Sequence, residues 1–239
     1  MKEHKHIAKA KELLSELTKH CVKSMPNREY SNLSKLPWKV MTFVNAMNWR
    51  MKESVEGAIL LLESNLTHPS LSLIRGCMEN AAITIRLSDV VDNVVQRKDI
   101  TDAVDLDLMK LLFGNNYRKD DPYIEPDDDR FKADRIGVHV ARADELYPGF
   151  RQYYSNLCEF VHPNSDGVGQ SYSMLHIEDD CTDFGPMLNS DHESYDAFTI
   201  TLVLAITIYL EQAEAIEKDL EDFIHLCDID VVKGILKDI

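Results

Sequence analysis

Apolar side chains recur every three or four residues along most of the 239-residue chain, with charged side chains between them. This spacing gathers the apolar residues on one face of an α-helix, whereas a half-buried strand requires alternation at every second position. Segments containing proline or glycine separate the periodic stretches. No internal repeat or shift in composition divides the chain. The sequence therefore predicts one all-α domain over residues 1–239, a helical bundle of about six to seven helices.

The proline and glycine breaks give approximate boundaries for these helices. The helical pattern covers approximately residues 7–25, 37–65, 70–90, 100–113, 131–146, 151–162 and 194–227, with a short terminal helix over 230–238. Ser70 is the expected N-cap of the third helix. Irregular insertions are expected at about 114–130 and 163–192, and the longer one allows at most a pair of strands beginning near Ser171. Such an insertion is either a lid or binding loop, or simply a mobile segment.

Charge is unevenly distributed along the chain. Residues 1–52 hold 11 Lys or Arg and 4 Asp or Glu, a net charge of +7, and the remainder carries −22, which gives −15 in total. The asymmetry marks either a basic arm for an anionic partner or two parts of one fold that attract each other. Positive charges alternate with apolar residues at helical spacing, which favours the second interpretation. We do not expect nucleic acid as a partner, except through the basic first two helices, because the acidic remainder repels phosphate.

Cysteine content and hydropathy indicate a soluble protein of the cytoplasm. The five cysteines are odd in number and widely spaced, with no C-x-x-C pair and no secretory signal ahead of them. We therefore expect reduced thiols. The longest apolar stretch, about 197–210, is shorter than the roughly 20 residues of a membrane span and contains three threonines. It predicts a buried core helix and no membrane partner.

Residues 151–167 form the stretch with the clearest chemical character. Arg151, Ser155, Glu159 and His162 follow at steps of four, four and three, which places them within about 80° of one helix face. His162 stands immediately before Pro163, which ends the helix. Two interpretations are open: His162 caps the helix end, or it is a catalytic acid or base.

A second polar face is expected on the third helix. Arg75, Glu79 and Arg86 lie four and seven residues apart, close to one line along the helix. They form either a surface ladder of ion pairs or a partly enclosed polar site, to which Gly76 and the neighbouring alanines would admit another helix. If this face meets the central helix, Arg75 and Glu79 would join Tyr154, Glu159 and His162 in one polar network or ligand site.

The segment Glu159-Phe160-Val161-His162 also matches E-x-x-H, one half of a di-iron carboxylate site. A complete site requires a second E-x-x-H, and the nearest candidate is Asp222-Phe223-Ile224-His225, with Asp in place of Glu. A di-metal helical bundle is therefore an alternative. No complete metal motif, phosphate-binding loop or nucleophile motif is present elsewhere, so we expect no metal and no cofactor.

Two of these segments carry a family likeness. Tyr154-x-x-Leu157-Cys158-x-x-x-His162-Pro163, preceded by Arg75-x-x-x-Glu79, resembles uncharacterised bacterial families of HEPN-like helical proteins. Many HEPN members are metal-independent RNases, toxins or defence proteins with an R-x(4 to 6)-H motif at a dimer interface. The resemblance implies a helical bundle and a shared polar site. The chain departs from the motif, because Arg151 lies eleven residues before His162.

These observations leave two functional hypotheses besides the di-metal protein. The first is a noncatalytic module that binds a small anionic ligand or a protein partner through its polar site, with a homodimer as a possible assembly. The second is a HEPN-like RNase in which His162 acts as acid or base and Arg75 or Arg151 stabilises a phosphate. Catalytic candidates are His162, Glu159 and Arg151.

Overall fold

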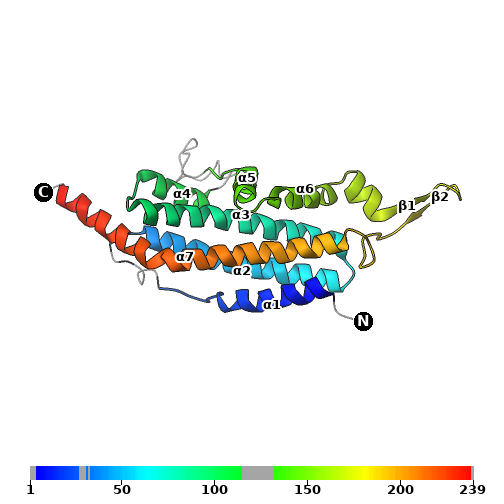
Figure 1. Ribbon diagram of the computed structural model, residues 1–239, viewed down its shortest axis with the longest axis horizontal. Coiled ribbons are helices and arrows are strands. Elements are labelled where there is room, and N and C mark those ends of the chain that lie inside the picture. Colours follow the sequence, from blue (N-terminus) through cyan, green and yellow to red (C-terminus); the bar gives the residue numbers. More distant parts are fainter. Residues whose placement is uncertain (1–3, 27–30, 32, 115–131, 238–239) are drawn as a thin grey trace, which may run out of the picture.

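The computed structural model describes residues 4–26, 31, 33–114 and 132–237 of the chain (Figure 1). This part contains seven α-helices, one π-helical turn and a two-stranded antiparallel sheet, so the predicted all-α bundle is confirmed. The expected insertion at 114–130 lies outside the described residues, except for Gly114. The elements are α1 (Lys5–Lys19), α2 (Leu36–Glu63), α3 (Thr67–Arg97), α4 (Asp102–Phe113), α5 (Ile136–Leu146), α6 (Phe150–Val161), the π-helical turn η2 (Ser165–Gln170), β1 (Ser173–His176), β2 (Cys181–Phe184) and α7 (Tyr195–Lys237).

Helix α7 forms the axis of the bundle. Its 43 residues span about 65 Å at 1.5 Å per residue, and Figure 1 shows it running alongside α1, α2 and α3. It packs most extensively on α3, and α1 and α2 enclose it further. Its inward side chains are almost inaccessible to solvent, among them Phe198, Leu202, Ile206, Tyr209, Ala213 and Ile216. Burial of a large apolar side chain stabilises a fold by roughly 1.5–3 kcal/mol, so this helix holds the core together.

The predicted break between two C-terminal helices is wrong, because α7 continues from Tyr195 to Lys237. The apolar pattern weakens at Asp228 and Asp230, but no proline or glycine interrupts the chain before Gly234. Cys227 remains buried at the point where the break was expected. A weaker apolar pattern at Asp228 and Asp230 therefore does not end this helix, which continues through Gly234 to Lys237.

Several predicted helix boundaries are also wrong, among them the end of α3 at Arg97 and the start of α5 at Ile136. Helix α1 ends at Lys19 rather than near Met25. The chain beyond it lies on α2, where the Trp49 indole N–H donates to the carbonyl oxygen of Val22 at 2.7 Å. Helix α3 begins at Thr67, so Ser70 lies inside its first turn, and its hydroxyl donates to the carbonyl oxygen of Thr67 at 2.6 Å.

Helices α4, α5 and α6 lie in a row along α3 (Figure 1). Arg142 on α5 joins that helix to α3 by two hydrogen bonds to the carboxylate of Asp89, at 2.8 and 2.9 Å. At the start of α3, the His68 ring contacts the carbonyl oxygen of Phe160 at 2.9 Å. These polar contacts fix the outer row of helices against α3.

Several ion pairs join the basic N-terminal segment to acidic parts of the fold. Lys11 Nζ lies 2.6 Å from Glu63 Oε1, and Lys39 on α2 pairs with Asp105 on α4. His20 Nδ1 lies 3.3 Å from Glu217 on α7. The pairing supports the interpretation that the two charge blocks attract each other when the helices pack.

Among the described helices, only α7 has the length and apolar character of a membrane span, over Tyr195–Gly234. Its most apolar window is 56% buried by the rest of the molecule. A core helix of a soluble protein has the same properties, and α7 is consistent with that description.

Tyr209 on α7 lies at a buried hydrogen-bond junction. Its hydroxyl donates to Asn48 Oδ1 at 2.7 Å, and Asn48 Nδ2 donates to the carbonyl oxygen of His20 at 3.0 Å. Replacement of Tyr209 by Phe leaves the buried Asn48 oxygen without this donor. We expect Tyr209→Phe to lower the free energy of unfolding by about 1–3 kcal/mol in urea titrations. A change below about 0.5 kcal/mol would show that the junction contributes little.

Candidate functional site

Helix α6 presents one side to α3 and another to the start of α7. Leu157 is 1% exposed and Phe150 is similarly enclosed. Tyr154 faces α3, whereas Tyr153 borders a pocket shared with α7. The two neighbouring tyrosines therefore belong to two different polar environments.

On the α3 side, three of the expected site residues lie together. The Tyr154 hydroxyl donates to Glu79 Oε1 at 2.9 Å, and Arg75 Nε lies 3.4 Å from the same oxygen. The side chains of Arg75 and Glu79 are 29% and 22% exposed, so the pair is half-buried. Arg75 Nε is itself buried and makes no well-aligned hydrogen bond. Arg86 does not belong to this cluster, because its guanidinium pairs with Asp107 on α4 at 2.6 Å.

The sequence predicted that Gly76 and the neighbouring alanines admit another helix beside this cluster, and the structure differs at Gly76. A Cβ added to Gly76 would meet no atom within 4 Å, so no helix approaches closely there. Ala81 and Ala82 are fully buried in the core. The close approach is at Gly57, where an added Cβ would lie 2.8 Å from Leu73 Cδ1. A Cβ at this contact of α2 with α3 would therefore require the end of the Leu73 side chain to shift.

The environment of Tyr154 favours its neutral form. Burial, and then the negative charge of Glu79 and a contact with Cys158, raise the pKa of the Tyr154 hydroxyl well above its ordinary value. The hydroxyl therefore stays protonated at neutral pH and donates to Glu79. Tyr154 links α6 to α3 and does not act as a base.

The other three candidates on α6 lie elsewhere. His162 is exposed at the C-terminal cap of the helix, where its backbone N–H donates to the carbonyl oxygen of Cys158 at 3.0 Å. Glu159 is exposed and accepts a hydrogen bond from Asn164 Nδ2 at 2.8 Å. Arg151 is exposed in the first turn, about 16 Å from His162 along the helix axis. No hydrogen bond or ion pair in the described part of the chain joins Glu159 or His162 to Arg75 or Glu79.

The two halves of the expected di-metal motif do not meet. Glu159 lies beside Phe198 near the start of α7, and Asp222 follows 24 residues later on that helix, about 36 Å away. Among the described residues, no group of three or more His, Cys, Asp or Glu side chains is placed to hold a metal ion. The two motifs therefore cannot form one dinuclear centre.

Two buried cysteines are also poorly suited to nucleophilic chemistry. Cys77 on α3 and Cys227 on α7 are enclosed by the core. Burial raises the pKa of each thiol to about 12. Both remain protonated at neutral pH, and the thiolate is the form that reacts.

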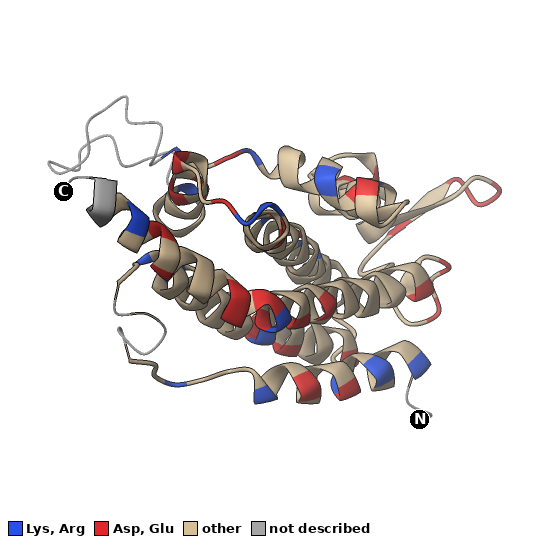
Figure 2. Ribbon diagram, turned by 60° about the vertical axis from the view of Figure 1, so that its left-hand side comes forward, with Lys and Arg blue, Asp and Glu red and all other residues tan. Residues whose placement is uncertain are grey.

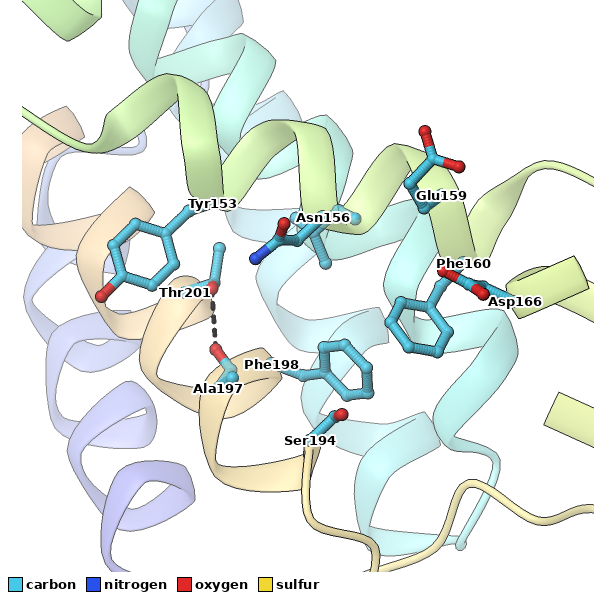
Figure 3. A pocket seen from close by; sticks show the side chains of 10 residues that line it. Tyr153, Asn156, Glu159, Phe160, Asp166, Ser194, Ala197, Phe198 and Thr201 are labelled. Atoms are coloured by element: carbon cyan, nitrogen blue, oxygen red, sulfur yellow. Dashed lines mark hydrogen bonds between the residues drawn. The ribbon is translucent and has the colours of Figure 1, made fainter. Parts of the chain in front are cut away.

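A pocket of about 130 Å³ lies on the opposite side of α6, against the first turns of α7 (Figure 3). Figure 3 shows Tyr153, Asn156 and Phe160 of α6 facing Phe198, Ser194 and Thr201. The rings of Phe160 and Phe198 pack edge to face with centroids 5.1 Å apart. The carboxylate of Asp166 lies beside Phe160, whereas Glu159 stands at the rim with its carboxylate directed away from α7. The pocket is thus mainly apolar, with hydroxyl, amide and carboxylate groups at its edge.

The first turn of the 163–192 insertion places Asp166 at this pocket. Asn164 Oδ1 accepts hydrogen bonds from the backbone N–H groups of Asp166 and Gly167, at 3.1 and 3.0 Å. A Cβ at Gly167 would lie 1.9 Å from the carbonyl oxygen of His162, so only glycine allows the turn to fold back on α6. Residues 173–184 of the insertion form the β1–β2 hairpin, which projects away from the bundle (Figure 1).

Sequence reasoning did not identify Asn156, Asp166, Ser194 or Phe198 as neighbours of Glu159. Asp166 and Ser194 lie in irregular segments whose path depends on tertiary contacts. One signal was visible, because the whole segment containing these residues lacks Lys and Arg. Comparison with protein-family models, with curated proteins and with solved structures finds no match for this chain.

Tyr153 and Tyr154 provide a matched pair for testing the α3–α6 network. We expect Tyr154→Phe to lower the free energy of unfolding by about 1 kcal/mol, because the hydroxyl donates to a carboxylate at a half-buried site. Tyr153 is 37% exposed, and Tyr153→Phe should change this free energy by less than about 0.5 kcal/mol. Equal effects of the two substitutions in urea titrations would contradict a specific role for the Tyr154 hydroxyl.

The raised pKa of Tyr154 also predicts a dependence on alkaline pH. Its folded-state pKa exceeds the unfolded value of about 10, so its contribution is complete below pH ~10 and is lost as pH rises toward the folded-state pKa. The stability difference between wild type and Tyr154→Phe should therefore be constant from neutral pH to about pH 9 and should shrink above pH ~10. Thermal unfolding of both proteins across this range measures it. A difference that grows with alkaline pH would contradict the assignment.

Proposed function

We propose that the chain is a noncatalytic binding module whose α6–α7 pocket receives a small organic cation, such as an amine. The observation that carries this proposal is the charge of the chain around the pocket. From Gln152 to Glu217, which includes every residue lining the pocket, the sequence has no Lys or Arg and twelve Asp or Glu. A cationic ligand is therefore attracted to this segment, and an anionic ligand is repelled.

The chemistry of the pocket supports a cation with an attached apolar group. Asp166 offers a carboxylate, and Asn156 and Ser194 offer further hydrogen-bond acceptors. The rings of Phe160 and Phe198 provide apolar contact, and an aromatic face attracts a cation by about 0.5–2 kcal/mol. A volume of about 130 Å³ corresponds to roughly four water molecules, so the ligand or the part of it that binds is small.

An anionic ligand at Arg75 has less support. Glu79 lies 3.4 Å from Arg75 Nε, so an incoming anion competes with a carboxylate already in place. Tyr154 also directs its hydroxyl at Glu79 rather than at open space. We interpret this cluster as a positioning network that holds α6 on α3. A location in the cytoplasm is proposed with this function, on the basis of the odd number and wide spacing of the cysteines.

The HEPN-like RNase remains a weaker proposal. His162 is accessible to a substrate, but Arg151 lies at the other end of α6, about 16 Å away along the axis. The nearest stretch of chain is acidic and repels an RNA backbone. Arg151 and His162 of a single copy therefore do not lie side by side.

Benzylamine is a suitable probe, because it joins an ammonium to one aromatic ring. We expect it to bind with a dissociation constant on the order of 1 mM, which is typical of a ligand of this size. Amide chemical shifts followed by NMR should change at α6 and the start of α7. Benzyl alcohol has the same shape without the charge and should bind several-fold more weakly, and benzoate should not bind.

Two substitutions serve as a matched pair for this experiment. Asp166→Asn removes the carboxylate beside Phe160 and should weaken benzylamine binding about tenfold. Glu159→Gln removes a rim carboxylate directed away from α7 and should weaken it less than about threefold. Equal binding of benzylamine and benzyl alcohol would sink the cation proposal. Cleavage of total RNA by the wild type, lost in His162→Ala, would replace it with the RNase.

A further inference from the structure

The β1–β2 hairpin carries an apolar face that no described part of its own chain covers. In the antiparallel register Ser173 pairs with Phe184 and Leu175 with Thr182, so Leu175 and Phe184 lie on one face, and Ile177 follows β1 as the first residue of the turn. The side chains of Leu175, Ile177 and Phe184 are 68%, 84% and 82% exposed. Ser173 and Thr182 complete this face, which contains no charged residue.

Exposure on this scale is unfavourable for an isolated hairpin. A two-stranded hairpin is at best marginally stable in water without packing against another element. This one projects from the end of the bundle (Figure 1), and its strands pair only with each other. Its turn carries Glu178, Asp179 and Asp180, and Figure 2 shows acidic residues and no basic ones on the hairpin. Its surface therefore combines an apolar face with a negative tip, which fits a groove that is apolar and rimmed by positive charge.

The same chain has a groove of that description. A cavity of about 250 Å³ lies between α2 and the segment after α1, lined by Val22, Met25, Ala46 and Trp49 with Lys23 at its edge. Val22 and Trp49 are 44% and 36% exposed. The Lys52 ammonium lies 5.7 Å from the centre of the Trp49 ring.

The charge of this region complements that of the hairpin. From Lys19 to Lys52 the sequence has seven Lys or Arg and one Glu. Lys39 and Lys52 pair with acidic residues of their own chain, while Lys23 lies at the groove. An acidic hairpin tip therefore meets positive potential at the groove, which steers association and fixes its orientation.

We propose that the β1–β2 hairpin of one copy docks its Leu175, Ile177 and Phe184 side chains in the α1–α2 groove of a second copy. The hairpin projects from the end of the bundle at which α1 begins, whereas the groove lies beyond the C-terminal end of this 15-residue, roughly 22 Å helix (Figure 1). Because the hairpin and the groove of one copy lie apart, the hairpin docks in the groove of a second copy. Another copy placed antiparallel brings both hairpins to both grooves, which closes the contact as a two-fold dimer. This inference is independent of the cation pocket.

Sedimentation velocity of the full chain tests the proposal. The contact is small, so we expect a dissociation constant on the order of 10 μM and a shift from monomer to dimer between about 1 and 200 μM. Raising the salt from about 0.1 M to 1 M shortens the Debye length from about 10 to 3 Å and should weaken the dimer several-fold. A monomer at every concentration would overturn the proposal.

Complementary variants identify the two surfaces. The double substitution Ile177→Ser/Phe184→Ser removes two of the exposed apolar side chains of the hairpin, and Val22→Asp places a charge in the groove. Each variant alone should lose at least tenfold in self-association. Their equimolar mixture should recover part of the association, because the mixed dimer has one intact hairpin facing one intact groove, whereas a dimer of either variant alone has no intact contact. Leu60, 65% exposed on α2 and part of neither the hairpin nor the groove lining, provides the control Leu60→Ser, which should dimerise like wild type.

Circular dichroism of each variant should match the wild type, because every substituted side chain is at least 44% exposed. If the mixture remains monomeric, the hairpin and groove are not partners and the proposal fails. Wild-type self-association by the hairpin variant would exclude the hairpin. Loss of association by Leu60→Ser would show that other apolar surface drives the dimer. Benzylamine binding is measured separately, so failure of the dimer leaves the pocket proposal standing.

Discussion

Burial of α7 is the interaction on which the rest of the structure depends. This helix is apolar on almost every side through its first half, so it cannot lie on the surface of a globular protein without exposing a large apolar patch. Helices α1, α2 and α3 cover it, and the buried Tyr209 finds its polar partner on α2. The outer row of α4, α5 and α6 then covers α3 by the same logic. The site residues on α6 are thus held at the second layer from the axis.

The pattern that specifies these helices was readable from the sequence, and the details of their ends were not. Periodicity placed every α-helix in the described part, because apolar residues at helical spacing require a buried face. It misplaced the start of α3, since a proline in a first turn is tolerated and Thr67 precedes Pro69. It also divided α7 at Asp228 and Asp230, where packing of Cys227 on the core maintains the helix.

The candidate site shows the same limit of sequence reasoning. Spacing placed Arg75 and Glu79 on one helix face and Tyr154 on another helix, and the structure brings these three together. Glu159 and His162 follow Tyr154 along α6, but they lie at a different angle around the helix axis. They therefore face solvent, whereas Tyr154 faces α3. Spacing along one helix gives the angle between two side chains around the helix axis. It does not show which neighbouring helix each side chain faces. For this reason the pocket between α6 and α7 could not be predicted from the sequence. Asp166 is placed there by a π-helical turn that depends on Asn164 and Gly167.

The segregation of charge gives the molecule a basic N-terminal segment and an acidic projecting hairpin. Within one chain, the basic segment is partly neutralised by pairs such as Lys11 with Glu63, which use charges near the core. The carboxylates of the hairpin turn project beyond these pairs and have no Lys or Arg among their neighbours in sequence. Net charge of one sign on a projecting arm resists aggregation of like arms, even though the arm exposes Ile177 and Phe184. The same charge favours contact with a positive groove, so one feature both suppresses hairpin-to-hairpin pairing and selects the docking surface.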